Sequence, residues 1–158
     1  NSIPRLVEII EKSKKKNYKK KINICTQTFQ AIRIFVNKEI SELVSGLIQA
    51  TKFLKKGGKL VLISFHSLED KIIKFYFTNY SKNKSKGSRY YPQTKNDNIL
   101  FENYKNKIIR PTVKEINENN PSRSAKLRYA TRSKDNFFYP EELKKRFINY
   151  LNLESENV

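Results

Sequence analysis

The side chains best suited to chemistry lie in one short stretch, Ser64-Phe65-His66-Ser67-Leu68-Glu69-Asp70. It follows the apolar run at residues 60–63 and precedes a helical pattern, so we expect a strand-to-helix turn. Ligands in open α/β sheets bind beyond the carboxyl ends of the strands, and the first amides of a helix attract anions. The candidate catalytic residues are therefore Ser64, His66, Ser67 and Glu69.

A purely structural interpretation fits the same residues equally well. Ser67 and Asp70 form the Ser-x-x-acid pattern of a helix start, which predicts Ser67 as the N-cap. His66 is the sole histidine and could be a hydrogen-bonded turn residue. The sequence has no Gly-x-Ser-x-Gly nucleophile elbow. It also has no histidine pair at helical spacing for a metal and no glycine-rich phosphate loop.

Two further sets of residues are basic and suit a phosphate backbone. Arg33 lies off the centre of an apolar helical stripe, where it should face a cleft. A second set, between residues 122 and 128, combines cations with serine hydroxyls and could form charge-assisted hydrogen bonds to phosphate. The predicted RNA-binding residues are Arg33, Arg123, Lys126 and Arg128. Residues 82–91 interleave cations with tyrosine, which suits either an RNA clamp or an unstructured insert.

Hydrophobic periodicity predicts the elements that position these residues. Apolar residues three and four apart over 26–55 predict one long helix, or two helices that meet near residue 37. The unalternated run at 60–63 predicts a strand buried on both faces, as in parallel sheets. We also expect helices at 1–11, 68–80 and 141–151, a helical turn at 115–119, strands at 108–113 and 125–131, and a long loop at 81–107. This order predicts an α/β fold of the doubly wound, Rossmann-like type.

Composition favours one domain that contacts polyanions. The 158 residues suit one domain rather than two. Lys and Arg number 33 against 15 Asp and Glu, a net charge of +18, which favours nucleic acid through counterion release. The excess of lysine fits the coding bias of an A/T-rich genome equally well. A single cysteine, with no membrane-length apolar run and no secretory signal, favours a cytoplasmic protein. The chain begins at Asn1 and contains no methionine, so we expect a fragment.

Three sequence blocks together resemble one family. Residues 26–34 resemble its Thr-Arg-x-Phe-Gln-Ala-Ile-Arg-Ile segment, and residues 57–70 resemble its Gly-Gly-Arg-Leu and Ser-Phe-His-Ser-Leu-Glu-Asp segments. Residues 120–128 resemble its Asn-Pro-Arg-x-Arg-Ser-Ala-Lys-Leu-Arg segment. The family is the bacterial and organellar 16S ribosomal RNA cytosine-N4 methyltransferases. Residues 23–27 depart from the family's His-Pro-Ala-Thr-Arg, so one basic residue is missing there.

The resemblance implies S-adenosylmethionine-dependent N4-methylation of a cytosine in 16S rRNA of the small ribosomal subunit. It implies the C-terminal part of a class I methyltransferase sheet. Residues 1–22 would form the end of a helical substrate-recognition insertion and a basic linker, with seven lysines between residues 12 and 21. Residues 23–135 would complete the methyltransferase domain, and 136–158 would form a helical tail. The family's cofactor-binding motifs precede this segment. We therefore expect no cofactor-binding residue in this chain, and a fragment that is inactive alone.

The resemblance also implies roles for the candidate residues. His66 and Glu69 become candidates for proton uptake, and Ser64 and Ser67 for orienting the target base. Two alternatives remain open, a non-catalytic basic RNA-binding module and a structural α/β fragment whose charge reflects coding bias. We expect marginal stability for the fragment, because half a parallel sheet leaves one strand without its neighbour.

Overall fold

The computed structural model describes residues 2–13, 24–81, 99–102 and 104–155. The predicted loop residues 82–91 lie outside these ranges, as does most of the basic segment before residue 24. The helices are α1 (Ile3–Ser13), α2 (Ile24–Val36), α3 (Glu39–Phe53), α4 (Ser67–Asn79), α5 (Val113–Glu118), the 3-10 helix η2 (Asn120–Ser124) and α6 (Glu141–Ser155). The strands are β1 (Lys59–Ser64), β2 (Phe101–Glu102) and β3 (Lys126–Arg132). No helix in the described ranges has both the length and the apolar character that a membrane crossing requires.

The chain divides into two compact units, one of residues 1–42 with 150–158, and one of residues 43–149. In the first unit α1 packs against α2. The buried Glu154, near the end of α6, accepts hydrogen bonds from the amides of Ile40 (3.0 Å) and Ser41 (2.7 Å). A carboxylate at the first amides of α3 satisfies orphan donors and opposes the positive end of the helix dipole. It thereby ties the chain's last helix to the start of α3.

The second unit is built on a three-stranded antiparallel sheet with the order β1-β3-β2. Leu60 pairs with Ala130 and Ser64 pairs with Lys126. The prediction of an α/β fold is confirmed. The described strands are antiparallel, however, and do not show the parallel arrangement that the apolar run favoured. β1 lies at the edge of this sheet, with β3 on one side only.

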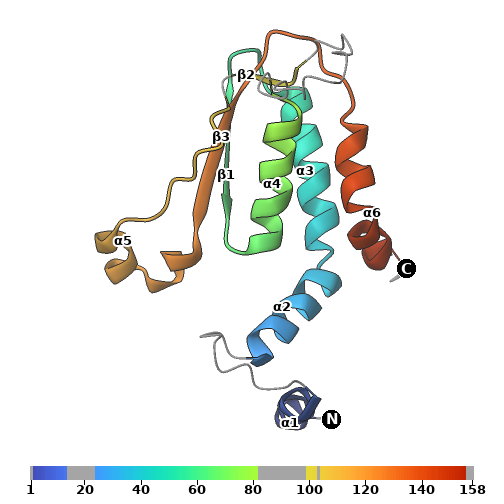
Figure 1. Cartoon of the computed structure of the whole chain (residues 1–158), viewed down its shortest axis with the longest axis vertical. Helices are drawn as coiled ribbons and strands as arrows, with labels where there is room; N and C mark the ends of the chain where they lie inside the picture. The colour runs from blue at the N-terminus through green and yellow to red at the C-terminus, as the bar shows by residue number, and fades with distance from the viewer. Residues whose placement is uncertain (1, 14–23, 82–98, 103, 156–158) are drawn as a thin grey trace, which may run out of the picture. The chain divides into compact units, whose positions relative to one another are not determined.

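Helix α4 covers one face of this sheet, and the part of α3 after residue 42 packs behind α4 (Figure 1). The Tyr76 hydroxyl joins the two helices by a hydrogen bond of 2.9 Å to Thr51 Oγ1. Burial raises the pKa of Tyr76 to about 12. The rings of Tyr76 and Phe77 meet Phe101 edge to face, a geometry that adds to apolar burial. The core therefore lies between the sheet and α3.

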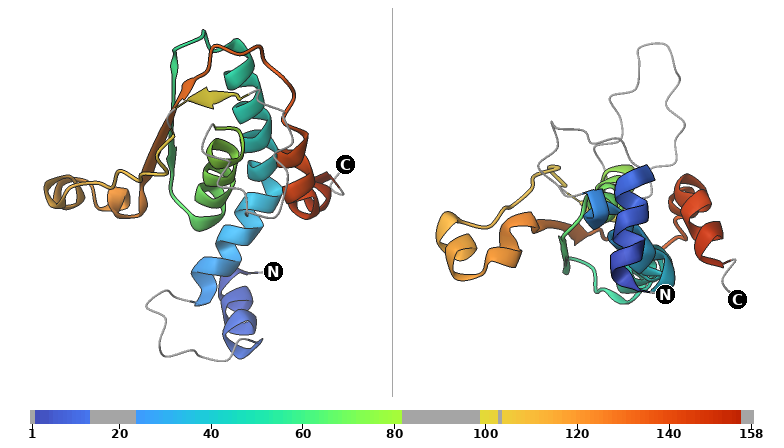
Figure 2. Two further views of the ribbon diagram at one scale, coloured as in Figure 1. Left: turned by 45° about the horizontal axis from the view of Figure 1, so that its top comes forward. Right: turned by 90° about the horizontal axis from the view of Figure 1, so that it is seen from below.

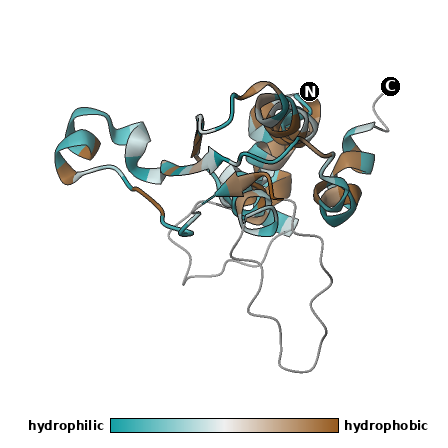
Figure 3. Cartoon of the chain, turned by 90° about the horizontal axis from the view of Figure 1, so that it is seen from above, coloured by the Kyte–Doolittle hydropathy of each residue, from teal (hydrophilic) through white to brown (hydrophobic). Residues whose placement is uncertain are grey.

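The opposite face of the sheet is apolar and exposed. Val61 and Ile63 of β1 retain 52% and 58% of their surface, and Tyr129, the partner of Val61 in β3, is also exposed. Figure 3, coloured by hydropathy, shows hydrophobic segments in the strands as well as in the helices. The prediction that β1 is covered on both faces is therefore wrong for the described residues, because α4 covers only one side.

Other element predictions need smaller corrections. The 26–55 pattern forms two helices separated by a turn at Asn37 and Lys38, which agrees with the predicted break near residue 37. The predicted strand at 108–113 is reduced to one bridge between Ile109 and Leu127. The 81–107 loop prediction missed β2. The predicted turn at 115–119 is α5, which lies with η2 beyond the end of β3, apart from the helical layer (Figure 2).

Buried Arg132 anchors residues 99–102 to β3. Its guanidinium donates hydrogen bonds to the Leu100 carbonyl (3.1 Å), the Ser133 hydroxyl (2.8 Å) and the Asp135 carbonyl (3.0 Å). The Asp135 carboxylate in turn accepts from the Ile99 amide at 2.9 Å. These polar bonds hold β2 against β3, and Phe101 fills the core beside them.

Candidate functional site

The 64–70 turn and the 120–128 segment meet at one end of the sheet, although about 60 residues separate them. Ser64 ends β1 opposite Lys126. The buried Ser64 hydroxyl donates to the Lys126 carbonyl at 3.4 Å. Ser67 begins α4 and is exposed. Two of the three sequence blocks thus form one local surface, at the carboxyl end of β1 where ligands of α/β folds commonly bind.

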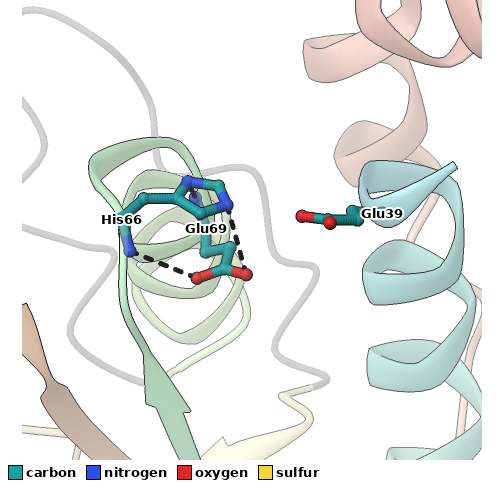
Figure 4. A group of neighbouring side chains, drawn as sticks. All are labelled: Glu39, His66 and Glu69. Atoms are coloured by element: carbon teal, nitrogen blue, oxygen red, sulfur yellow. Dashed lines mark hydrogen bonds and ion pairs between the residues drawn. The ribbon is translucent and has the colours of Figure 1, made fainter. Parts of the chain in front are cut away.

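His66 and Glu69 hold each other in place at the start of α4 (Figure 4). His66 Nδ1 accepts from the Glu69 amide at 3.3 Å, and the Glu69 carboxylate accepts from the amides of Phe65 (2.9 Å) and His66 (3.3 Å). The second carboxylate oxygen lies 3.2 Å from His66 Nε2. In a neutral imidazole that accepts through Nδ1, Nε2 carries the N–H group and lies beside this carboxylate oxygen. The pair therefore forms a closed local network.

The prediction of Ser67 as the N-cap is wrong, because His66 occupies that position. His66 has extended backbone angles, its side chain accepts from the amide three residues on, and Glu69 reaches back to the His66 amide. This is a capping box in which an imidazole replaces the usual hydroxyl. Ser67 is the first helical residue, so its exposed hydroxyl is not used as the cap.

A buried ionic cluster lies beneath the turn. Asp70 accepts from Arg128 Nε (2.7 Å) and Nη2 (3.3 Å), and from Lys126 Nζ (3.1 Å). Arg128 Nη1 also donates to the Tyr104 hydroxyl and to Asn106 Oδ1, both at 3.0 Å. Burial opposes ionisation of Asp70, but the hydrogen bonds and charges of Arg128 and Lys126 outweigh it and hold the pKa of Asp70 below its usual value. Burial raises the pKa of Tyr104. The cluster fixes α4 to β3 at this end of the sheet.

The predicted RNA-binding cations occupy different environments. The Arg128 side chain is only 3% exposed and is committed to Asp70, and Lys126 is partly buried beside it. Arg123 is exposed on η2 and donates to Asn120 Oδ1 at 3.0 Å. Arg33 belongs to the other unit, where it pairs with Glu39 at 2.8 Å. Arg123 and Arg33 are thus presented to solvent, whereas Arg128 supports the turn from below.

Two features of the site escaped prediction. Phe65 exposes its ring directly beside His66, and its place between two candidate residues was the available signal. Tyr104 and Asn106 contact Arg128 from a segment predicted to be loop. No signal in the local sequence marks that contact, because it depends on how residues 104–106 return to the sheet.

A family model described as the MraW methylase family matches residues 1–133 of the chain. The chain belongs to the MraW methylase family. Proteins named ribosomal RNA small subunit methyltransferase H are similar to it. The one from Agrobacterium fabrum is 42% identical over 128 residues, which cover 81% of this chain and 36% of that protein. The one from Ehrlichia ruminantium (strain Gardel) is 43% identical over 81% of this chain and 40% of its own length. This member therefore spans about two fifths or less of the length of these relatives.

Methylase families of this kind use S-adenosylmethionine, but the described residues do not form a site for it. Doubly wound dinucleotide-binding folds hold ribose hydroxyls with a carboxylate beyond a strand end and place a glycine-rich turn beside the cofactor. At the carboxyl end of β1, Glu69 and Asp70 are already engaged by the partners given above. Gly57 and Gly58 lie at the opposite end of β1, where a Cβ on Gly58 would fall 2.8 Å from Leu54 Cδ1. The glycine pair therefore closes the helix-to-strand turn.

Proposed function

We propose that this chain is the C-terminal part of a cytoplasmic enzyme that methylates the N4 amine of a cytosine in 16S rRNA of the small ribosomal subunit. The methyl donor is S-adenosylmethionine, whose main binding motifs lie in the part of the protein outside this chain. One observation carries the proposal: the 64–70 turn and the 120–128 segment, both of which resemble this enzyme family, lie together at the carboxyl end of β1.

The turn supplies the wall of the active site that faces the target base. The exposed ring of Phe65 and the exposed hydroxyl of Ser67 face solvent beside the His66–Glu69 pair. An aromatic face can stack on a base that has left its helix, and a hydroxyl can bond its edge. The His66–Glu69 pair takes up the proton that the cytosine amine loses, at the Glu69 carboxylate or at His66 Nδ1 once its bond to the Glu69 amide opens. Ser67 orients the base directly, whereas the buried Ser64 acts through its bond to the Lys126 carbonyl, which positions the turn.

The remaining candidate residues are cations that either contact the RNA or hold the 64–70 turn in place. Exposed Arg123 binds RNA phosphates directly, and exposed Arg33 contacts RNA from the other unit. Lys126 and Arg128 share one carboxylate, Asp70, so the cluster keeps a net positive charge close to the turn. We assign Arg128 to positioning the turn. We assign Lys126 to positioning the turn and to binding RNA.

The open edge and the exposed apolar face of β1 fit a larger methyltransferase sheet. Val61 and Ile63 would be covered by the part of the protein that this chain does not contain, since the relatives are more than twice as long as the matched region. An exposed apolar edge strand would otherwise invite aggregation. The chain alone should therefore be marginally stable and should bind RNA without transferring methyl groups.

The reaction can be tested with the protein encoded by the complete reading frame that contains this chain. Purified protein, S-adenosylmethionine and small-subunit RNA should yield N4-methylcytidine, identified by mass spectrometry of the digested RNA. Calorimetry should show cofactor binding by the complete protein and none by the 158-residue chain. A methyl group on the cytosine ring carbon or on the ribose would refute the assignment, as would a complete protein that binds no cofactor.

The role of His66 can be separated from its capping role by one substitution. Asparagine is a favourable N-cap, so His66→Asn keeps an acceptor for the Glu69 amide but cannot take up a proton near neutral pH. General-base contributions are typically about 10²–10⁴-fold, so kcat should fall by at least about 100-fold while thermal stability changes little. Ser67→Ala is the matched control at the neighbouring exposed position, and it should alter KM more than kcat. A His66→Asn variant with unchanged kcat would restrict His66 to capping.

A further inference from the structure

The first unit contains an open pocket that includes Arg33 and whose other lining residues have no role in the function proposed above. It has a volume of about 520 Å³ and is lined by Cys25, Thr26, Phe29, Gln30 and Arg33. These residues recur at helical spacing, so they form one face of α2. The volume falls within the usual range for small-molecule pockets. All five residues belong to residues 1–42, so the cavity is contained within one unit.

The lining combines a ring face with groups that can form hydrogen bonds in both directions. Phe29 retains 36% of its surface, although it is a large apolar side chain. Gln30 carries an amide that both donates and accepts, and Thr26 adds a hydroxyl. Cys25 is buried at the base of this face. The pocket therefore offers apolar contact and polar recognition at the same place.

The guanidinium of Arg33 is held in a fixed plane at the rim. Its Nε and Nη2 donate to the two carboxylate oxygens of Glu39 at 2.8 and 3.1 Å. The Arg33 side chain nevertheless remains 57% exposed. A bidentate pair of this kind fixes orientation and largely neutralises the net charge. Arg33 thus presents an oriented planar group and not an isolated cation.

We propose that this pocket binds an unstacked nucleobase of single-stranded RNA. A bare phosphate would gain little from Phe29, and Glu39 offsets the attraction of Arg33. A purely aliphatic partner would leave the Gln30 amide without hydrogen bonds, which is unfavourable. A base satisfies all of these groups, because its face stacks on the ring and its edge bonds the amide. The net charge of +18 draws the RNA backbone toward the chain.

The pocket assignment rests on the RNA substrate proposed above and adds a second recognition point to it. The 64–70 turn belongs to residues 43–149, whereas the pocket belongs to the other unit. RNA recognition of single strands commonly uses splayed bases stacked on aromatic side chains. Base recognition by this pocket would therefore give the protein a sequence or shape preference at a nucleotide other than the one that is methylated.

The test is fluorescence anisotropy of a labelled single-stranded RNA with the 158-residue chain and with Phe29→Leu. Loss of the ring should weaken binding about tenfold, which corresponds to about 1.4 kcal/mol. Phe35→Leu is the matched control, since Phe35 lies on the same helix with 38% exposure but does not line the pocket. It should leave the affinity unchanged. Gln30→Ala, a substitution that favours the helix, should weaken binding about threefold or more.

A second probe separates base stacking from charge. With an RNA that contains abasic sites throughout, wild type and Phe29→Leu should bind equally, and far-UV circular dichroism should confirm that both are helical. Equal effects of Phe29→Leu and Phe35→Leu would overturn the pocket assignment and leave the RNA substrate intact. The same conclusion would follow if Phe29→Leu weakened binding to the abasic RNA as much as it weakened binding to the RNA that carries bases. A wild-type chain that binds neither RNA would overturn the RNA substrate and the pocket together.

Discussion

Replacing Arg128 with methionine should lower the free energy of unfolding by about 3 kcal/mol at neutral pH. Arg128 donates two hydrogen bonds to Asp70 and one each to Tyr104 and Asn106. Methionine fills a similar volume without donors, so a buried carboxylate loses two charge-assisted bonds at about 1.5–3 kcal/mol each. Lys126 remains 3.1 Å from Asp70 and compensates in part. The estimate therefore lies at the lower end of the range of about 3–5 kcal/mol for breaking a buried pair.

The pH dependence of this loss distinguishes an ionic cause from lost packing. The pKa of Asp70 is lowered in the folded state, so its contribution to stability is present above the unfolded pKa of about 4. It is lost as the pH falls through the folded pKa. The stability gap between wild type and Arg128→Met should therefore narrow below pH of about 4. A gap caused by packing alone would persist there.

Urea denaturation followed by circular dichroism measures both quantities. At neutral pH the predicted loss corresponds to a fall in Tm of about 6–12 °C for a chain of this size. Arg123→Met provides the matched control, because Arg123 is exposed and, within the described part of the chain, bonds Asn120, and it should change stability by less than about 0.5 kcal/mol. A loss below about 1 kcal/mol for Arg128→Met, or a gap independent of pH, would refute the ionic account.

Three further predictions concern the buried Glu154 and Tyr76 and the turn residue Gly57. Glu154→Gln should cost about 1 kcal/mol in urea denaturation, because the amide keeps one acceptor for the first turn of α3 but loses the charge at the helix dipole; equal stability would contradict this. With a pKa raised to about 12, Tyr76 should ionise after the exposed tyrosines in an absorbance titration. The neutral hydroxyl should contribute its full stability below a pH of about 10, and this contribution should be lost as the pH rises through about 12. Ionisation of Tyr76 together with the exposed tyrosines, in a chain that is still folded, would contradict this prediction. Gly57→Ala should cost about 1 kcal/mol in thermal denaturation, since Gly57 has a φ of +79°, whereas an unchanged Tm would show that this turn adapts.

The positions of the helices could be predicted from the sequence, whereas the residue that caps the start of α4 could not. The 68–80 prediction and the observed α4 (Ser67–Asn79) differ by about one residue, because apolar spacing marks the buried side directly. The N-cap was assigned to Ser67 by residue type. Two overlapping patterns, His66 with Glu69 and Ser67 with Asp70, compete at adjacent positions. Asp70 does not complete the pattern with Ser67, because it accepts hydrogen bonds from Arg128 and Lys126. Only the folded structure reveals those partners.

Strand pairing depends on contacts that local sequence does not record. The apolar run of β1 predicted a strand correctly but not its partner, because an antiparallel neighbour more than 60 residues away leaves no periodic trace. β2 has two residues within a polar stretch, so no window of usual length detects it. Its order comes from Arg132 and from the packing of Phe101 on Phe77.

The cations of β3 show why a charge alone is a weak guide to a binding site. The alternation over 125–131 predicted a half-buried strand, and such a strand normally turns its apolar side inward. In the structure Arg128, Ala130 and Arg132 are buried, while Tyr129 is exposed. Asp70 and the carbonyls around residues 100 and 133 supply every buried guanidinium described here with acceptors, and this offsets the desolvation that would otherwise forbid the arrangement. A partly polar inner face also leaves the apolar face of the sheet outward, where the proposed remainder of the methyltransferase would cover it.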